Sequence, residues 1–323
     1  MSAADPVRWG VLATGGIASK FVQDISRVPE AEVVAVGSRA VDTAAAFASA
    51  HGIPRSYGTW AELAADPDVD IIYVATPHSH HHAAARICLA AGKPLLVEKA
   101  FTLDLAQAQD LVTMAREREL FLMEAMWTRT LPAILRLQQL LADGAIGAIT
   151  SVHAAFGLGL EFEPSHRLRN PELGGGALLD LGVYPVHFAH MLLGSPTHVQ
   201  AWAQLHPEGT DARTGVVLGF AAGALATLYC GVGGEIRSAS IVGTLGRVEF
   251  PYGFHNASAF VLHRAGADPE MIEAEPAGLN YQAAEAGRCL RAGLTQSPLV
   301  PLDATLDVMR TLDAIRAQIG VVY

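Results

Sequence analysis

Short apolar segments alternate with Ala-rich amphipathic segments over the first 126 residues of the chain. The apolar segments read VRWGVL, EVVAVG, DIIYVAT, PLLVEK and LFLMEAM, and they lie between Val7 and Met126. Strand-length apolar runs separated by helical patterns are typical of a parallel sheet with crossover helices. The pattern therefore predicts an α/β domain over residues 1–126.

The pattern changes after Leu131-Pro132, where strand-like segments follow one another through Gly-containing turns. These segments read AITSVHAAFG, THVQAWAQL, TGVVLGF, ALATLYCG, ASIVGTLGRVEF and AFVLHR. Such a succession favours an open, mainly antiparallel sheet, and three helical patterns accompany it. The helices are expected within Gly176–Leu193, where Pro185 predicts a kink or break, at Tyr281–Ala292 and at Leu302–Ile319. Residues 127–323 are thus predicted to form a second, α+β domain, whose last helix can pack back on the first.

Composition limits the classes of partner. The 323 residues are 51% hydrophobic, enough for two cores, and carry a net charge of -10 without runs of Lys or Arg. Nucleic-acid and anionic-membrane surfaces need concentrated positive charge, so we expect a small-molecule partner instead. No apolar stretch is long enough to span a bilayer and MSAADPVRWG lacks signal-peptide features, so we expect a cytoplasmic protein.

The cysteines do not suggest a framework or a metal site. Cys88, Cys230 and Cys289 are isolated, odd in number and without metal-type spacing. We therefore expect buried free thiols and no metal.

A Gly-rich turn joins the first predicted strand to the first predicted helix in GVLATGGIASKF. A turn of this kind directs backbone N–H groups at a pyrophosphate. Against the G-x-G-x-x-G/A pattern it gives Ala13-x-Gly15-x-x-Ala18, so alanine stands where the first glycine is usual. A turn without function remains open, but its place in the first strand-turn-helix unit favours a dinucleotide. The predicted contacts are Ala13, Thr14, Gly15, Gly16 and Ile17.

The end of the second predicted strand indicates which dinucleotide is bound. NAD enzymes usually place an acidic residue there for the ribose 2′-hydroxyl, whereas this chain has Ser38 and Arg39. Because a guanidinium pairs with a 2′-phosphate, we predict NADP in preference to NAD. The alternative is that Arg39 is an ordinary surface arginine.

Histidines are clustered in ATPHSHHHAAARICLA, which follows the apolar run DIIYV. Open α/β sheets bind ligands at the carboxyl ends of their strands, so Thr76, Pro77, His78 and His81 are predicted to line the nicotinamide and substrate pocket. His80 and His82 are expected to be solvated. A metal site is disfavoured because no carboxylate or thiolate accompanies the cluster.

Charged and phenolic groups that could carry acid/base chemistry occur in two places. KPLLVEKAFTL sets Glu98 and Lys99 at the end of an apolar strand, and Asp180 and Tyr184 share one face if their segment is helical. A cation near a phenol favours phenolate, so Lys99 and Tyr184 make a plausible acid/base couple. A surface ion pair for Lys99, and capping or packing for the other two, are the alternatives.

The motifs VEKAFTL, GGGALLDLGVY and MEAMWTRTLPA, in this order, resemble the glucose-fructose oxidoreductase and inositol dehydrogenase (Gfo/Idh/MocA) family over nearly the whole chain. The last motif is similar to the branch of dimeric dihydrodiol dehydrogenase and NADP-dependent xylose dehydrogenase. The resemblance implies a Rossmann-type first domain and an open C-terminal sheet that forms a homodimer or higher homo-oligomer. It departs from the family at Ala13 and at Ala100, which replaces the proline of Glu-Lys-Pro.

The resemblance also implies roles for individual residues. Lys99 and Asp180 match the catalytic lysine and aspartate, and Tyr184 lies where relatives have Tyr or His. The implied cofactor contacts include Glu98 and Lys99. The implied substrate and pocket residues are His78, His81, Trp127, Arg129, Phe156 and Tyr184.

Together these features predict an NADP-dependent oxidoreductase. It would move a hydride between nicotinamide and a CH–OH carbon of a sugar or cyclic trans-diol, with Tyr184 as acid/base. Two alternatives stay open: a redox-neutral, NAD-dependent glycosidase, and a non-catalytic nucleotide sensor. The missing acid beside Arg39 weighs against the first, and the presence of Lys99, Asp180 and Tyr184 weighs against the second.

Overall fold

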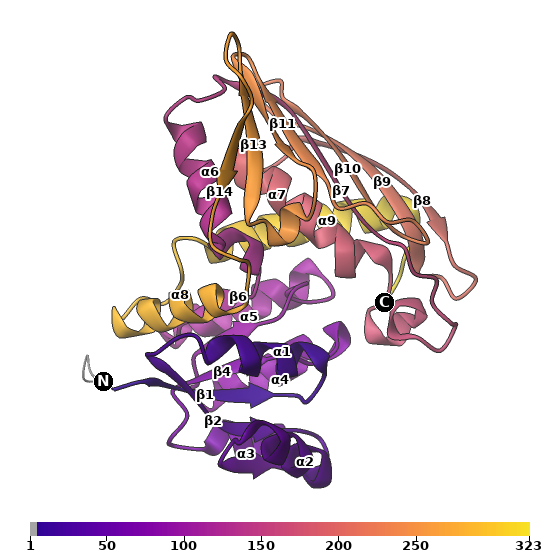
Figure 1. Cartoon of the computed structure of the whole chain (residues 1–323). Coiled ribbons are helices and arrows are strands. Elements are labelled where there is room, and N and C mark those ends of the chain that lie inside the picture. The colour runs from indigo at the N-terminus through magenta and orange to yellow at the C-terminus, as the bar shows by residue number, and fades with distance from the viewer. Residues whose placement is uncertain (1–4) are drawn as a thin grey trace. The chain divides into compact units, whose positions relative to one another are not determined.

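The structure is a computed structural model, and it describes residues 5–323 (Figure 1). The chain divides into two compact units. The first comprises the residues up to Trp127 together with Gly278–Leu306, and the second comprises Thr128–Ala277 and Asp307–Tyr323.

The first unit contains a six-stranded sheet in the order β3-β2-β1-β4-β5-β6, with every pair parallel. The strands are β1 (Val7–Leu12), β2 (Ala31–Gly37), β3 (Arg55–Tyr57), β4 (Ile71–Val74), β5 (Leu95–Val97) and β6 (Leu122–Glu124). The helices are α1 (Gly16–Ile25), α2 (Val41–His51), α3 (Trp60–Ala65), α4 (His78–Ala90), α5 (Leu105–Glu117) and α8 (Asn280–Arg291).

The strand order reverses direction between β1 and β4. Every residue of β4, β5 and β6 is buried, as expected for parallel strands covered by helices on both faces. In sheets of this order, ligands bind outside the carboxyl ends of the strands at the point of reversal. The loops after β1, β2, β4 and β5 all lie at that edge.

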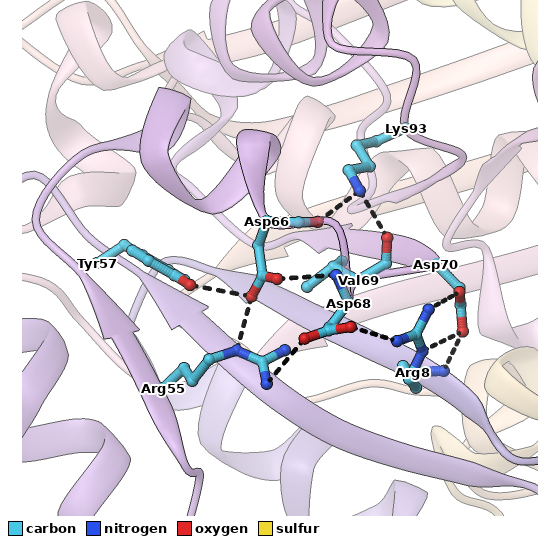
Figure 2. Close-up of polar contacts among 8 residues, drawn as sticks. All are labelled: Arg8, Arg55, Tyr57, Asp66, Asp68, Val69, Asp70 and Lys93. Carbon is cyan, nitrogen blue, oxygen red and sulfur yellow. Dashed lines mark hydrogen bonds and ion pairs between the residues drawn. The ribbon is translucent and has the colours of Figure 1, made fainter.

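The amino-terminal edge of the same sheet is closed by a polar network (Figure 2). Arg55 Nε and Tyr57 Oη both donate to Asp66 Oδ2, at 2.8 and 3.0 Å. Lys93 Nζ donates to the carbonyls of Asp66 and Val69, at 2.6 and 2.7 Å. The network consists of Arg8, Arg55, Tyr57, Asp66, Asp68, Val69, Asp70 and Lys93. Because its charges are paired within the protein, we assign it a structural role.

The second unit contains an eight-stranded sheet in the order β14-β13-β12-β11-β7-β10-β9-β8. Only β7 and β10 pair in parallel among its strands, so the sheet is mixed but mainly antiparallel. The strands are β7 (Ile149–Leu158), β8 (His198–Leu205), β9 (Asp211–Gly219), β10 (Leu225–Val232), β11 (Ala239–Gly243), β12 (Gly246–Phe250), β13 (Ala259–Arg264) and β14 (Glu270–Glu273). The predicted fold class is confirmed.

Helices cover one face of this sheet. Helix α6 (Pro132–Ala142) precedes β7, and α7 (Val183–Leu193) packs against β7 and β10 (Figure 1). The end of α9 (Leu302–Ile319) is tied to β8 because Gln318 accepts from Ala201 N and donates to Val199 O. Along β8, β9 and β10, every second residue points to the other face of the sheet, away from these helices.

Helical segment Pro171–Leu193 is long and apolar enough to cross a membrane by length and composition, the one such segment among residues 5–323. Its most apolar window is 83% buried, which is the burial of a core helix. Pro185 does not break it. A π-helical turn, η4 (Leu178–Gly182), precedes α7 instead, and Pro185 lies in the first turn of α7.

The division into units differs from the predicted ranges because residues 278–306 return to the first unit. Helix α8 packs on α1, and the backbone N–H of Leu279 donates to the buried carboxylate of Asp24 at 2.9 Å. A polar backbone anchor of this kind leaves no mark in the hydrophobic pattern.

Candidate active site

The Gly-rich turn after β1 leaves open space above its backbone. Beyond the adjacent residues and the backbone of α1, a Cβ added at Gly15 or Gly16 would meet no described atom within 4 Å, and Gly15 has an extended conformation that any residue can adopt (φ -79°, ψ 179°). By contrast, a Cβ at Gly37 would lie 2.9 Å from Leu63 Cβ. Gly37 is thus required by packing, whereas packing gives no reason for Gly15 and Gly16.

The start of α1 suits an anion. No side chain caps this helix, and no acidic residue lies in its first turn. Uncapped N–H groups and the positive end of the helix dipole attract phosphates. With the open space over the two glycines, the turn fits the pyrophosphate of a dinucleotide, whose predicted contacts are Ala13, Thr14, Gly15, Gly16 and Ile17.

Ala13 adopts a left-handed backbone conformation with φ +105°. Its N–H donates to the carbonyl of Gly37 at 2.9 Å, which ties the ends of β1 and β2 together. The turn therefore has the backbone that its first glycine would provide, at the cost of strain that a side chain brings there.

Ser38 and Arg39 follow β2 at the same edge, with Arg39 exposed. This is where the sequence predicted contacts to the adenosine end of NADP. Arg39 also contacts His80, a residue for which the sequence predicted only solvent.

His78 and His81 lie at the start of α4, directly after the loop that follows β4. His81 is fully buried, and its ring nitrogens lie 2.8 Å from Thr76 O and 2.9 Å from Ala100 O. Burial, chiefly, lowers the pKa of His81 to about 3, and a neutral ring donates its single N–H to one of these two carbonyls. His78 Nε2 lies 3.2 Å from Lys99 O. Both histidines thus support the backbone that carries Lys99, in addition to any contact with ligand.

Glu98 and Lys99 leave the end of β5 with different surroundings. The Glu98 carboxylate is buried and accepts from Tyr73 Oη at 2.5 Å and from Lys99 N at 3.3 Å. Phe21 stacks on Tyr73 at 3.9 Å between ring centroids. Lys99 is only half-buried, and its peptide bond to Ala100 is cis. The glutamate therefore anchors the strand end, while the lysine lies at the ligand-binding edge.

In the second unit, three consecutive glycines dock a short helical turn. A Cβ at Gly175 would lie 2.5 Å from Arg167 O, and one at Gly176 would lie 2.3 Å from Asp211 Oδ1. Gly174 and Gly176 have φ of +69° and +111°, which favours glycine. This segment brings η2 (Arg167–Arg169) against the start of η4.

Asp180 lies in η4 and forms a two-pronged ion pair with Arg167. The distances are 3.3 Å from Nη1 to Oδ1 and 3.1 Å from Nη2 to Oδ2. Asp180 is almost buried, whereas half of the Arg167 side chain is exposed. Arg167 is not predictable from the sequence, because no spacing rule connects it to Asp180.

Tyr184 follows one helical turn later, within an aromatic cluster. Its ring lies 5.4 Å from those of Phe156 and His255, and these two stack at 4.1 Å. The main-chain carbonyl of His255 accepts from Thr128 Oγ1 at 2.6 Å. The structure thus brings together Asp180, Tyr184 and Phe156, and it adds His255, a lone histidine without a sequence signal.

Trp127 and Arg129 belong to a 3-10 turn, Trp127–Thr130, after β6. Both are half-buried. Trp127 ends the first part of the first unit, and Arg129 belongs to the second. Across residues 5–323, no group of three or more His, Cys, Asp or Glu side chains could hold a metal ion.

Similar proteins place both units in one family. Residues 7–126 match "Oxidoreductase family, NAD-binding Rossmann fold", and residues 134–249 match "GFO/IDH/MocA C-terminal domain". Trans-1,2-dihydrobenzene-1,2-diol dehydrogenases of Macaca fascicularis and Homo sapiens are 36% and 35% identical, and each alignment covers 98% of both chains.

Solved structures agree. KijD10, a 3-ketoreductase from Actinomadura kijaniata in complex with NADP and TDP-benzene, is 27% identical over 98% of both chains, with a TM-score of 0.85. Aldose-aldose oxidoreductase from Caulobacter crescentus shares the fold, with a TM-score of 0.88 over 97% of both chains at 24% identity. The resemblance seen in the sequence is confirmed, and the chain belongs to the GFO/IDH/MocA family of oxidoreductases with a nucleotide-binding Rossmann domain.

Proposed function

We propose that this enzyme is an NADP-dependent dehydrogenase or reductase acting on a CH–OH carbon of a sugar or cyclic trans-diol. The observation that carries the proposal is the arrangement of Tyr184 in an aromatic cluster, one helical turn from the ion-paired Asp180. Full-length similarity to dihydrodiol dehydrogenases and to a 3-ketoreductase supports the substrate class.

The nicotinamide cofactor would supply or accept the hydride. Tyr184 exchanges a proton with the substrate oxygen, because a phenol is suited to general acid/base catalysis when its surroundings adjust its acidity. Lys99 provides the cation that favours phenolate and holds a substrate hydroxyl. Asp180 orients the reacting group, with Arg167 restricting its carboxylate to one geometry.

Substrate binding is proposed for Trp127, Arg129 and Phe156. A flat aromatic side chain such as Phe156 can pack against the apolar face of a ring, and Arg129 can donate to hydroxyl oxygens. This combination would suit cyclic polyols better than open-chain alcohols.

The preference for NADP is proposed from Ser38 and Arg39. A guanidinium at the end of β2 can form a charge-assisted pair with the 2′-phosphate. The structure of KijD10 with NADP supports this choice.

A substrate panel tests the proposed activity. Pentoses, hexoses and trans-dihydrodiols would be offered with NAD and NADP in parallel, and cofactor absorbance would be followed in both directions. Turnover of at least one cyclic polyol, faster with NADP, is expected. Absence of turnover across the panel despite cofactor binding would contradict the proposal.

We further propose a cytoplasmic homo-oligomer built through the second unit. Trp202, Val217 and Leu225 point outward on neighbouring strands β8, β9 and β10, with exposed fractions of 75%, 45% and 52%. Apolar side chains gathered on an uncovered sheet face commonly mark an interface. The buried free thiols of Cys88, Cys230 and Cys289 suit a reducing compartment.

A further inference from the structure

Two basic side chains meet at the carboxyl edge of the first unit's sheet. Arg39 follows β2, and His80 lies in the first turn of α4. Arg39 Nη1 lies 3.3 Å from His80 Nε2, and Ser79 Oγ lies 3.0 Å from the other ring nitrogen. The edge of the His80 ring meets Trp60 at 6.1 Å between centroids. The imidazole is therefore held against the guanidinium by its neighbours.

No carboxylate accompanies this pair. Asp42 at the start of α2 and Glu62 at the start of α3 form no hydrogen bond or ion pair with His80 in the described part of the chain. Burial, and then the Arg39 charge, lower the pKa of His80, so both disfavour the imidazolium in the absence of a ligand.

His82 on the same helix shows the contrasting arrangement. Its Nε2 lies 2.7 Å from Asp110 Oδ2, and Arg86 also pairs with Asp110. There, two basic groups converge on an acid supplied by the protein. Arg39 and His80 converge without one, which is what a site for an external anion requires.

We propose that His80 is a second binding residue for the 2′-phosphate of NADP, and that it takes up a proton when the phosphate binds beside Arg39. This inference rests on the proposed preference for NADP. A phosphate carries about -1.5 to -2 charges near pH 7, so its arrival reverses the sign of the field at His80. The proton comes from solvent and binds a ring nitrogen, and the resulting imidazolium donates a charge-assisted hydrogen bond to a phosphate oxygen.

The direction of the pH dependence follows from linkage. The pKa of His80 is lowered in the free protein and raised in the complex, so the complex binds more protons. The contribution of His80 to NADP affinity is full at pH values below the free pKa, and it is lost as the pH rises through the pKa of the complex. Between the pKa of His80 in the free protein and its pKa in the complex, the affinity for NADP falls about tenfold per pH unit.

Calorimetric titration measures this without turnover. NADP and NAD, and the fragments 2′,5′-ADP and 5′-AMP, would be titrated at several pH values in buffers with different heats of ionisation. The dependence of the observed heat on the buffer gives the number of protons taken up. The proteins would be wild type, His80→Gln, Arg39→Ala and, as the matched control on the same helix, His82→Gln. Gln retains an N–H donor but cannot take up a proton.

We expect wild type and His82→Gln to take up more protons with NADP than His80→Gln does, and the same difference with 2′,5′-ADP. With NAD and 5′-AMP the three proteins should agree. The protonation of the free phosphate, near pH 6, is common to all variants.

The outcomes separate the two proposals. If Arg39→Ala binds NADP and NAD with an unchanged ratio of affinities, the proposed cofactor preference fails. If Arg39→Ala loses the preference while His80→Gln takes up the same number of protons as wild type, the role of His80 is overturned and the preference stands. An equal loss of proton uptake in His82→Gln would also overturn it, because the effect would then belong to the helix and not to this contact.

Discussion

Replacing Gly15 by Ala tests whether the turn after β1 is reserved for a cofactor. Apart from Gly15 and its two chain neighbours, no described atom lies within 4 Å of the added carbon, and the φ of -79° is open to alanine. Two small effects on folding oppose each other. Alanine stabilises by about 0.4–1 kcal/mol through the unfolded chain, and it is a poorer N-cap than glycine by a similar amount. The free energy of unfolding should therefore change by less than about 1 kcal/mol.

Cofactor binding should respond much more strongly. A methyl group over this backbone keeps a pyrophosphate from its N–H donors, and a hydrogen bond to a charged group contributes about 1.5–3 kcal/mol. Losing one such bond weakens binding by roughly 10- to 150-fold.

Gly37→Ala is the matched control. Its added carbon would lie 2.9 Å from Leu63 Cβ, well inside the optimal separation of about 3.5–4.0 Å. Overpacking of this kind costs about 1–3 kcal/mol, or a fall in Tm of several degrees. Both substitutions add one methyl group to a glycine. Gly15→Ala should weaken cofactor binding with little change in stability, whereas Gly37→Ala should lower stability.

The assay pairs calorimetric cofactor titration with thermal unfolding of both variants without ligand. If Gly15→Ala binds NADP as tightly as wild type, the open space is not the cofactor site. If it loses as much stability as Gly37→Ala, the reading of its surroundings is wrong.

Four further predictions concern catalysis, backbone strain, assembly and pH. Lys99→Met and Tyr184→Phe should each lower turnover about 10²- to 10⁴-fold in steady-state kinetics, with the double variant little worse; additive losses would show that the two do not share one proton transfer. Ala13→Gly should raise Tm, because relief of about 1–2 kcal/mol of left-handed strain exceeds the entropic cost of about 0.5–1 kcal/mol; a lower Tm would contradict this. Trp202→Glu should give a monomer in light scattering, and an unaffected oligomer would place the interface elsewhere. Burial raises the pKa of Asp211 to about 6 against 3.8, so its contribution to stability, about 3 kcal/mol, is lost as the pH rises from 4 to 7. Asp211→Asn should flatten that loss in urea titrations across the same pH range, and an identical slope would refute the assignment.

The regular elements could be predicted where the hydrophobic pattern is strong. The last helix was predicted at Leu302–Ile319, which are its bounds in the structure. Strands β3 and β14 were missed because they are three and four residues long, and RSY and EMIE carry little apolar signal. The irregular turn before α7 was expected at Pro185, but it lies one turn earlier, where the missing N–H of proline leaves the preceding turn free to widen.

The candidate site was predictable only where its residues follow strands or share a helix. Ser38 and Arg39, and likewise Glu98 and Lys99, were located because a strand end is visible in the sequence. Arg167 and His255 were not, because no local pattern links them to their partners. Three glycines dock the turn that carries Arg167, and His255 meets Phe156 from a 3-10 turn about 100 residues away in the chain. His80 was predicted to be solvated, and its contact with Arg39 joins the end of β2 to the first turn of α4, 41 positions later in the chain.

The return of residues 278–306 to the first unit has a consequence for protein synthesis and for engineering. A ribosome finishes the eight-stranded sheet before it makes α8, so the first unit cannot complete its fold while the chain is only half synthesised. A fragment that stops at Trp127 would leave Asp24 without the Leu279 N–H and α1 without its neighbour. A chimera that exchanges the nucleotide-binding unit between relatives must therefore exchange two separate stretches of gene, one at the beginning and one near the end.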